Sequence, residues 1–292
     1  MNMIVERAAD WLLPPRISRG AFQLVRTFRG ILRTDPEVRR SVGRNRELRN
    51  LWQGERAFVL CTGPSIQQEE LLPLAREHCI AVSMFSLHPA YREIAPEFHV
   101  LAPNHAPLGE AGADKMLRAY KNAETSRTTM LLGHMDYEHS YLAHMRRNPE
   151  LRPARLRFLN FDGARHLDEL NWNRPALWEL SGRPFLLRSV LYGALQLALY
   201  MGCDRIYILG ADQNYLESFY APSEHFYREE EGVSDRLIHQ NISPLELLDD
   251  IYYSWQGYEL IRRYAEKKNQ RIVNCSGGML PIFPRARLKN IL

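Results

Sequence analysis

A short polar turn follows directly on the apolar run FVLC at residues 58–61. It consists of Thr62, Gly63, Pro64 and Ser65. Glycine lets the backbone approach a ligand closely, and proline stiffens the turn. Ser65 is a natural N-cap for a helix predicted over residues 67–77, whose free N–H groups would attract an anion. The glycine spacing matches neither a P-loop nor a GxGxxG fingerprint. The turn therefore predicts a bound monophosphate unit rather than a wrapped triphosphate, with a plain strand-to-helix turn as the alternative.

A carboxylate stands at a comparable place later in the chain. Gly210 closes the apolar stretch RIYILG, and Asp212 follows two residues later. A carboxylate there could accept hydrogen bonds from a sugar or ribose hydroxyl, or help to hold a metal ion. The alternative is an aspartate that only caps its own loop.

A general base is suggested by His225, in the polar stretch SEHFYREEE. The ordinary pKa of histidine suits proton abstraction from a hydroxyl near neutral pH. His239 and His105 are weaker alternatives, and a loop histidine can equally be a surface or packing residue. Tyr215 and Tyr220 lie nearby, and their hydroxyls could donate to a leaving phosphate or simply pack within the loop.

A further anion contact is suggested just before the strongly apolar segment 190–201. Arg188 and Ser189 precede this predicted helix. If Ser189 caps the helix, the pair could face an anion, and local capping and pairing is the equal alternative.

These residues lie between short apolar segments that alternate with helical patterns. Strands are predicted over residues 57–61, 80–84, 98–102, 129–132, 205–210 and 271–274. Helices are predicted over 67–77, 189–201 and 251–268, with irregular chain over 134–183 and a polar excursion over 212–250. Alternation of this kind predicts the α/β class, with a mostly parallel sheet covered by helices on both faces.

Ligands of such sheets bind beyond the carboxyl ends of the strands. Small or polar residues stand at each of these predicted ends, and they include Ser83, Asn104 and Asn274 in addition to the two turns above. Together they predict a cleft for a nucleotide or a similar polar ligand.

The chain is predicted to divide into a helical extension over residues 1–55 and a nucleotide-binding domain over 56–290, in which 212–250 form a lid-like excursion. Residues 1–50 hold 11 Arg and 5 Asp or Glu, a charge of +6 within a total of +4. Residues 17–34 form a basic amphipathic pattern that predicts either a helix packed on the body or one lying on an anionic membrane surface. The basicity belongs to this extension, so nucleic acid is not an expected partner.

Composition places the chain among soluble globular proteins, with 45% hydrophobic and 25% charged residues. No apolar run is long enough to span a bilayer and no signal peptide is evident, so we expect a cytoplasmic protein, with a peripheral position on the inner face of the membrane as an option. The four separated cysteines predict buried free thiols, and no metal ligand set is evident. Homo-oligomerisation is left open.

Four motifs occur in a familiar order: FVLCTGPSI, RSVLYGALQLALYMGCDRIYILGADQNY, EHFY and IVNCSGGMLPIFPR. Residues 56–290 resemble bacterial glycan-biosynthesis proteins related to the 6-hydroxymethylpterin diphosphokinases. They also resemble, more loosely, bacterial CMP-sialic-acid-dependent sialyltransferases. The resemblance implies a Rossmann-like sheet that binds a CMP-sugar without metal.

The resemblance also implies roles for individual residues. The turn 62–65, Ser83 and Asn104 would contact the nucleotide, and Arg188-Ser189 match an Arg/Ser pair displaced by one position. Tyr215 and Tyr220 would bind the leaving phosphate. The family's lid histidine falls at Ile251-Tyr252 here, so that His225 is the nearest substitute, and Thr62 replaces the usual asparagine of the turn.

The sequence therefore predicts a metal-independent glycosyltransferase that uses a nucleotide-activated sugar, with CMP the expected nucleotide, and a glycan or lipid-linked acceptor. One alternative is a pterin diphosphokinase-like phosphotransferase that uses ATP and Mg²⁺, with Asp212 as a metal ligand. The other is a non-catalytic nucleotide-sugar-binding scaffold.

Overall fold

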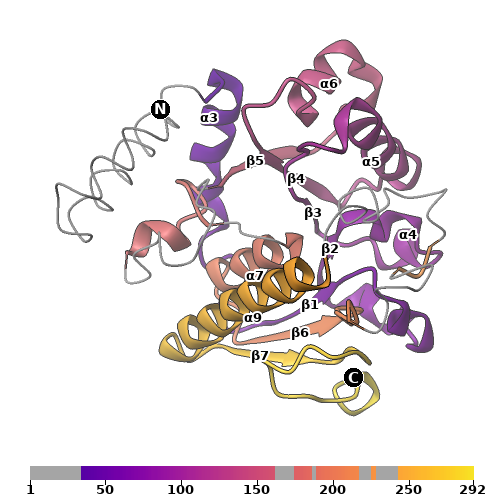
Figure 1. Cartoon of the computed structure of the whole chain (residues 1–292), viewed down its shortest axis with the longest axis vertical. Coiled ribbons are helices and arrows are strands. Elements are labelled where there is room, and N and C mark those ends of the chain that lie inside the picture. Colours follow the sequence, from indigo (N-terminus) through magenta and orange to yellow (C-terminus); the bar gives the residue numbers. More distant parts are fainter. Residues whose placement is uncertain (1–33, 162–173, 186–188, 217–224, 228–242) are drawn as a thin grey trace.

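The computed structural model describes residues 34–161, 174–185, 189–216, 225–227 and 243–292. Within these residues the centre of the molecule is one sheet of seven parallel strands (Figure 1). The strands are β1 Arg56–Leu60, β2 His78–Val82, β3 Phe98–Leu101, β4 Thr129–His134, β5 Leu156–Asn160, β6 Arg205–Leu209 and β7 Arg271–Asn274. The predicted α/β class with a Rossmann-like parallel sheet is confirmed.

The strand order is β5-β4-β3-β2-β1-β6-β7. The chain therefore builds outward from β1 to β5 and then returns to the other side of β1 as β6. In the register of the sheet Leu60 lies opposite Ala81 of β2 and Leu209 of β6. The turns that follow β1 and β6 thus meet at the point where the strand order reverses, which is where open parallel sheets bind ligands.

Helices cover both faces of the sheet (Figure 1). α7 (Val190–Tyr200) and α9 (Pro244–Lys267) pack on one face, where the inward residues of β1 are Ala57 and Val59. The other face carries Phe58 and Leu60 and is covered by α3 (Pro36–Arg44), α4 (Tyr91–Ile94), α5 (Gly109–Ala123) and α6 (Tyr141–Arg147). Alternation along each strand thus builds two cores, as burial on both faces requires.

Short 3-10 helices complete the described chain. They are η1 Asn45–Leu48, η2 Pro64–Gln68, η3 Leu72–Arg76, η4 Ser83–Leu87, η5 Pro149–Leu151, η7 Pro175–Trp178 and η8 Leu288–Asn290. The helix predicted over 67–77 is wrong, because only η2 and η3 form there, separated by extended backbone at Glu69. Pro73 lacks an N–H group and stands where a continuous α-helix would need one.

Two further expectations are corrected. The segment 134–183 is not irregular throughout, because α6 and β5 lie within it. α9 starts at Pro244 instead of residue 251, since Ser243 and Glu246 form a reciprocal capping box that fixes the helix start. The last residues of the predicted 212–250 excursion therefore belong to a packed helix.

Residues 34–55 pack on the sheet. Val38 and Val42 of α3 are buried in the second core. The Ser41 hydroxyl accepts a hydrogen bond from the Phe158 N–H, and the Asn45 amide donates to the Phe158 carbonyl at 2.8 Å. α3 therefore covers β5, an edge strand of the sheet. The helix predicted over 17–34 lies outside the described residues except for Thr34.

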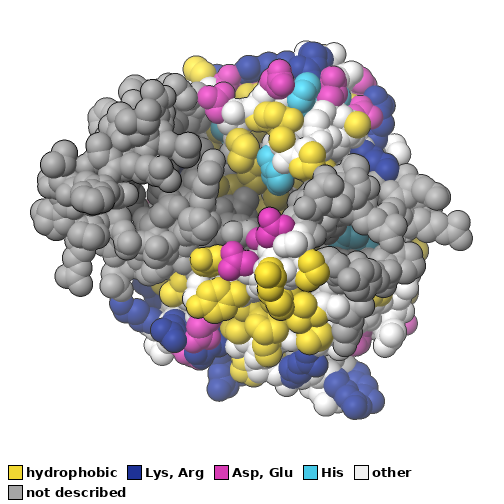
Figure 2. All heavy atoms as spheres, viewed as in Figure 1, with side chains coloured by type: hydrophobic (Ala, Val, Ile, Leu, Met, Phe, Trp, Pro, Cys, Tyr) yellow, Lys and Arg dark blue, Asp and Glu magenta, His cyan; other side chains and the backbone are white. Residues whose placement is uncertain are grey.

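The cysteines and the exposed apolar residues were also examined against the expectations from composition. The four cysteines are buried and free, as predicted. In the part of the chain that the structure describes, no helix combines the length and apolarity that a membrane crossing demands. Hydrophobic side chains gather over the region of α9 (Figure 2), where Leu245, Leu248 and Tyr252 are exposed. Their spacing of three and four residues places them on one side of the helix.

Candidate functional site

The turns after β1 and β6 are bonded directly to each other. The Gly63 N–H donates to the Gly210 carbonyl at 2.7 Å. The Asp212 carboxylate accepts the Ser65 N–H at 2.7 Å on Oδ2 and the Ser65 hydroxyl on Oδ1. Asp212 is only 5% exposed. Asp212, which is predicted to meet a sugar hydroxyl or a metal ion, thus holds the β1 turn in place.

The close approach of these turns depends on glycine. A Cβ at Gly63 would lie 2.5 Å from the Gly210 carbonyl oxygen and 2.8 Å from Asp212 Oδ2. Gly210 itself has φ +68°, in the left-handed region that favours glycine. The small residues at this edge therefore serve the contact between the two loops.

Ser65 was predicted to cap an α-helix, and this prediction is wrong. It lies inside η2, a five-residue 3-10 helix preceded by Gly63, and no side chain caps that helix. The Ser65 N–H and hydroxyl are both directed to Asp212. The predicted anion site at a helix start is therefore wrong for this turn, because a protein carboxylate already takes the donors.

The loop after β7 joins the same group. Asn274 is fully buried, and its Oδ1 accepts the Ser276 N–H at 2.9 Å. The Ser276 hydroxyl in turn accepts the Ala211 N–H at 2.8 Å, and the Met279 N–H donates to the Asp212 carbonyl. Asn274 therefore shapes the loop that supports Asp212.

His225 is the predicted residue that the structure brings to this point. Its Nδ1 lies 3.0 Å from Thr62 Oγ1, and the N–H of Phe226 donates to the Thr62 carbonyl at 2.9 Å. The half-buried imidazole stacks on Tyr227, with ring centroids 4.8 Å apart. A histidine 163 residues away in sequence is thus held against the turn after β1.

Ser83 and Asn104 are positioned by other contacts. Ser83 has φ +52°, and its carbonyl accepts the Nε2–H of buried His99 at 2.7 Å. Burial lowers the pKa of His99 to about 4. Asn104 donates its amide hydrogens to the carbonyls of Gly109 and His139, which ties two loops together. Neither side chain bonds to the Thr62–His225 pair or to the Ser65–Asp212 pair among the described residues.

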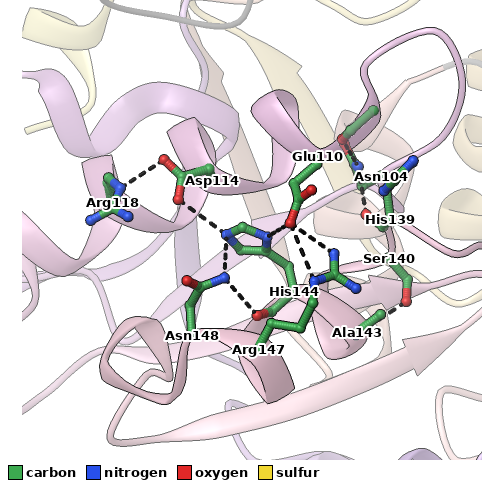
Figure 3. A network of polar contacts seen from close by, with 11 residues as sticks. Asn104, Glu110, Asp114, Arg118, His139, Ser140, Ala143, His144, Arg147 and Asn148 are labelled. Atoms are coloured by element: carbon green, nitrogen blue, oxygen red, sulfur yellow. Dashed lines mark hydrogen bonds and ion pairs between the residues drawn. The ribbon is translucent and has the colours of Figure 1, made fainter.

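A buried histidine that the sequence analysis missed lies at the centre of a polar network between α5 and α6 (Figure 3). His144 of α6 is 3% exposed and lies between Asp114, 3.1 Å from Nε2, and Glu110, 3.4 Å from Nδ1. Arg147 lowers the pKa of Glu110, and Arg118 lowers that of Asp114. The i, i+4 spacing of the two acids on α5 could have signalled a polar α5–α6 contact, but its partner could not be read from sequence.

Some of the other residues predicted for the site lie within the described residues, and the rest lie outside them. Ser189 caps α7 by accepting the Leu191 N–H at 3.2 Å, as its local alternative required. Tyr215 is half-buried, and His105 Nδ1 lies 2.6 Å from the carbonyl of the next residue. Arg188, Tyr220 and His239 lie outside the described residues.

A metal site in a protein needs several His, Cys, Asp or Glu side chains close together. Among the residues that the structure describes, no three or more His, Cys, Asp or Glu side chains are grouped as a metal site would require. Each carboxylate oxygen of Asp212 already accepts one hydrogen bond from Ser65.

No protein-family model and no curated protein sequence matches this chain. The fold and site define an α/β protein with a Rossmann-like parallel sheet, a polar switch point and a histidine docked on it.

Proposed function

We propose that this protein is a glycosyltransferase that takes a nucleotide-activated sugar, with CMP as the expected nucleotide, and builds a surface glycan. The observation that carries the proposal is the docking of His225 on Thr62 at the switch point of the sheet. A base is thereby held where parallel sheets bind nucleotides, as sugar transfer to a hydroxyl requires.

The reaction assigned to this site is one displacement. His225 takes the proton of the acceptor hydroxyl, and the acceptor oxygen forms a bond to the anomeric carbon of the sugar. The bond from that carbon to the phosphate oxygen breaks, and its electron pair leaves with the nucleotide phosphate. Tyr215 and Tyr220 are assigned to stabilise the departing phosphate, and the imidazolium later returns its proton to solvent.

The charge of Asp212 sets a condition on the donor. A phosphate next to this carboxylate would be repelled, whereas a ribose or sugar hydroxyl would donate to it. We therefore assign hydroxyl groups of the donor to Asp212 and the phosphate to the hydroxyl of Tyr215. This assignment keeps the Ser65–Asp212 contact intact during binding.

A thermal-shift panel of CMP, CDP, UDP, GDP and ATP, each with and without Mg²⁺, tests the nucleotide. Stabilisation by CMP without metal is expected, because a ligand that binds only the folded state raises the melting temperature. Stabilisation only by ATP with Mg²⁺ would favour the phosphotransferase alternative. The absence of any response would favour a non-catalytic scaffold.

Replacement of the base tests the mechanism. His225→Ala is expected to lower kcat by roughly 10² to 10⁴ while CMP stabilisation persists. His105→Ala is the matched control, because His105 contacts the carbonyl of its own neighbour and not the β1 turn. Full transfer activity in the His225→Ala protein would remove His225 from the mechanism.

A lipid-linked acceptor is supported by the exposed row Leu245, Leu248 and Tyr252 on α9. Apolar side chains at such exposure suit a hydrocarbon chain. Leu245→Ser/Leu248→Ser is expected to raise KM for a lipid-linked acceptor and to leave KM for a short soluble acceptor unchanged. Equal KM changes for both acceptors would contradict this assignment.

A further inference from the structure

The outer side of α3 carries exposed arginines. Val38 and Val42 are spaced four residues apart and are buried in the core. Arg40 and Arg44 have the same spacing, fall on the opposite side of the helix and are exposed. An added Cβ at Gly43, also on this side, would meet nothing within 4 Å. No described residue therefore covers the outer side of α3.

Two further arginines extend this surface. Arg39 of α3 and Arg46 of η1 are also exposed. Arg39 donates to the Thr34 carbonyl at 3.1 Å. Within the described ranges, neither these two arginines nor the two above form an ion pair with a carboxylate. We call Arg39, Arg40, Arg44 and Arg46 the α3 basic face.

The acids near this face are bonded to arginines of other elements. The pairs are Asp35 with Arg146, Glu37 with Arg152, and Glu47 with Arg157. Arg157 contributes most to lowering the pKa of Glu47, and Arg44 adds a smaller attraction at longer range. Arginines of α6, of β5 and of the chain between them thus neutralise these acids. The α3 basic face therefore keeps an excess of positive charge.

The sequence before α3 continues this charge. Residues 11–34 hold five Arg and no Asp or Glu, together with apolar residues such as Phe22, Val25 and Leu32. This stretch lies outside the described residues except for Thr34, so that only its composition enters. Arginines beside apolar side chains match an anionic lipid surface, which offers both headgroup phosphates and hydrocarbon. Nucleic acid would match the charge alone.

We propose that the α3 basic face docks on an anionic membrane, where its guanidinium groups bind the phosphates of lipid headgroups. The planar guanidinium suits bidentate hydrogen bonds to phosphate oxygens. Because α3 lies along β5, docking would turn this edge of the sheet toward the membrane (Figure 1). The inference does not rest on the transferase activity proposed above. It extends the membrane contact expected for residues 17–34 to the folded body.

The test is flotation of the full chain with phosphatidylcholine vesicles that contain about a third phosphatidylglycerol, and with vesicles of phosphatidylcholine alone. Binding to the anionic vesicles is expected to be at least about tenfold tighter than binding to the neutral ones. An increase of NaCl from about 50 to about 500 mM should lower the bound fraction, because salt screens exposed charges.

Arg40→Gln/Arg44→Gln is expected to weaken binding to the anionic vesicles by about tenfold or more, since each arginine near such a surface adds to the attraction. Lys267→Gln/Lys268→Gln is the matched control. It removes the same charge from the end of α9, where both lysines are exposed and neither pairs with a carboxylate of the described chain. Arg40→Lys/Arg44→Lys keeps the charge and should bind within about threefold of the wild-type protein.

Full binding by Arg40→Gln/Arg44→Gln would overturn the proposal, and so would an equal loss in Lys267→Gln/Lys268→Gln. Equal binding of the wild-type protein to neutral vesicles would do the same. Tighter binding of double-stranded DNA than of the vesicles, lost in Arg40→Gln/Arg44→Gln, would assign the face to nucleic acid instead. The assay contains no sugar donor, so that its outcome is independent of CMP binding and of transfer.

Discussion

The two edges of the sheet use their polar residues differently. At the carboxyl edge the loops after β1, β6 and β7 bond one another through Ser65, Asp212 and Ser276. At the amino edge the final turns of α7 and α9 border a cavity, and among its lining residues the Gln196 amide oxygen has no hydrogen-bond partner in the described part of the chain. A gathering of polar residues in sequence therefore does not by itself mark an open site, because such residues often hold loops together first.

The largest expected effect on stability is at Gly63, in the closely packed carboxyl edge of the sheet. Gly63→Ala is expected to lower the free energy of unfolding by about 3 kcal/mol, because the new Cβ would meet backbone and carboxylate atoms under 3 Å away. Urea denaturation measures the change.

Gly43→Ala is the control for Gly63→Ala. Gly43 lies within α3, and nothing lies within 4 Å of an added Cβ. This change should stabilise the protein by about 0.5 to 1 kcal/mol. Equal effects of the two substitutions would mean that the carboxyl-edge loops are not closed as described.

The next largest effect concerns pH. Burial lowers the pKa of His99 from 6.5 to about 4, so the unfolded chain binds this proton more tightly than the folded protein does. Stability from this group is complete above about pH 6.5 and is lost as the pH falls toward 4, by up to roughly 3 kcal/mol. Urea denaturation of the wild-type protein between pH 7 and pH 4, compared with His99→Gln, measures the contribution.

The slope of unfolding free energy against pH should be shallower in His99→Gln. His88→Gln is the control, because burial also lowers the pKa of His88 but this ring is only partly enclosed. If His99→Gln and the wild-type protein lose stability in parallel, His99 does not hold Ser83 as a neutral imidazole.

A smaller effect is expected from the contact between the two turns. Asp212→Asn should cost about 2 kcal/mol, and Ser65→Ala about 1 kcal/mol, because each removes part of a charge-assisted pair of hydrogen bonds. The double variant should cost less than the sum, since both changes remove the same interaction. Chemical denaturation of all four proteins completes the cycle, and strict additivity would contradict the contact.

The smallest effect is expected at the amino edge. Ala176→Trp should change the free energy of unfolding by less than about 0.5 kcal/mol, because the side chain enters open space at an exposed position. A small change in unfolding free energy for Ala176→Trp at the amino edge, beside a large loss for Gly63→Ala at the carboxyl edge, would confirm that the two edges differ in packing. A loss as large as that of Gly63→Ala would show that the cavity is not open.

Periodicity predicted most strands, since buried parallel strands are short apolar runs between polar turns. It missed β5 and α6 because LRFLN and YLAHMRR are short and carry Arg, Asn or His. It overextended the helix at 67–77 because apolar spacing was weighed above Pro73. Of the residues predicted for the site, His225 lies against the β1 turn, whereas Asn104 bonds the carbonyls of Gly109 and His139.

By itself the sequence determined the α/β class, the parallel sheet and the residue types at its carboxyl edge, because these depend on local patterns of apolar and polar residues. Only the tertiary structure decided that Asp212 bonds Ser65, 147 residues away, and that Gln196 and Gln270 meet beside one cavity. Such contacts join segments that are distant in the chain, and their partners are chosen by the packing of the whole sheet and its helices.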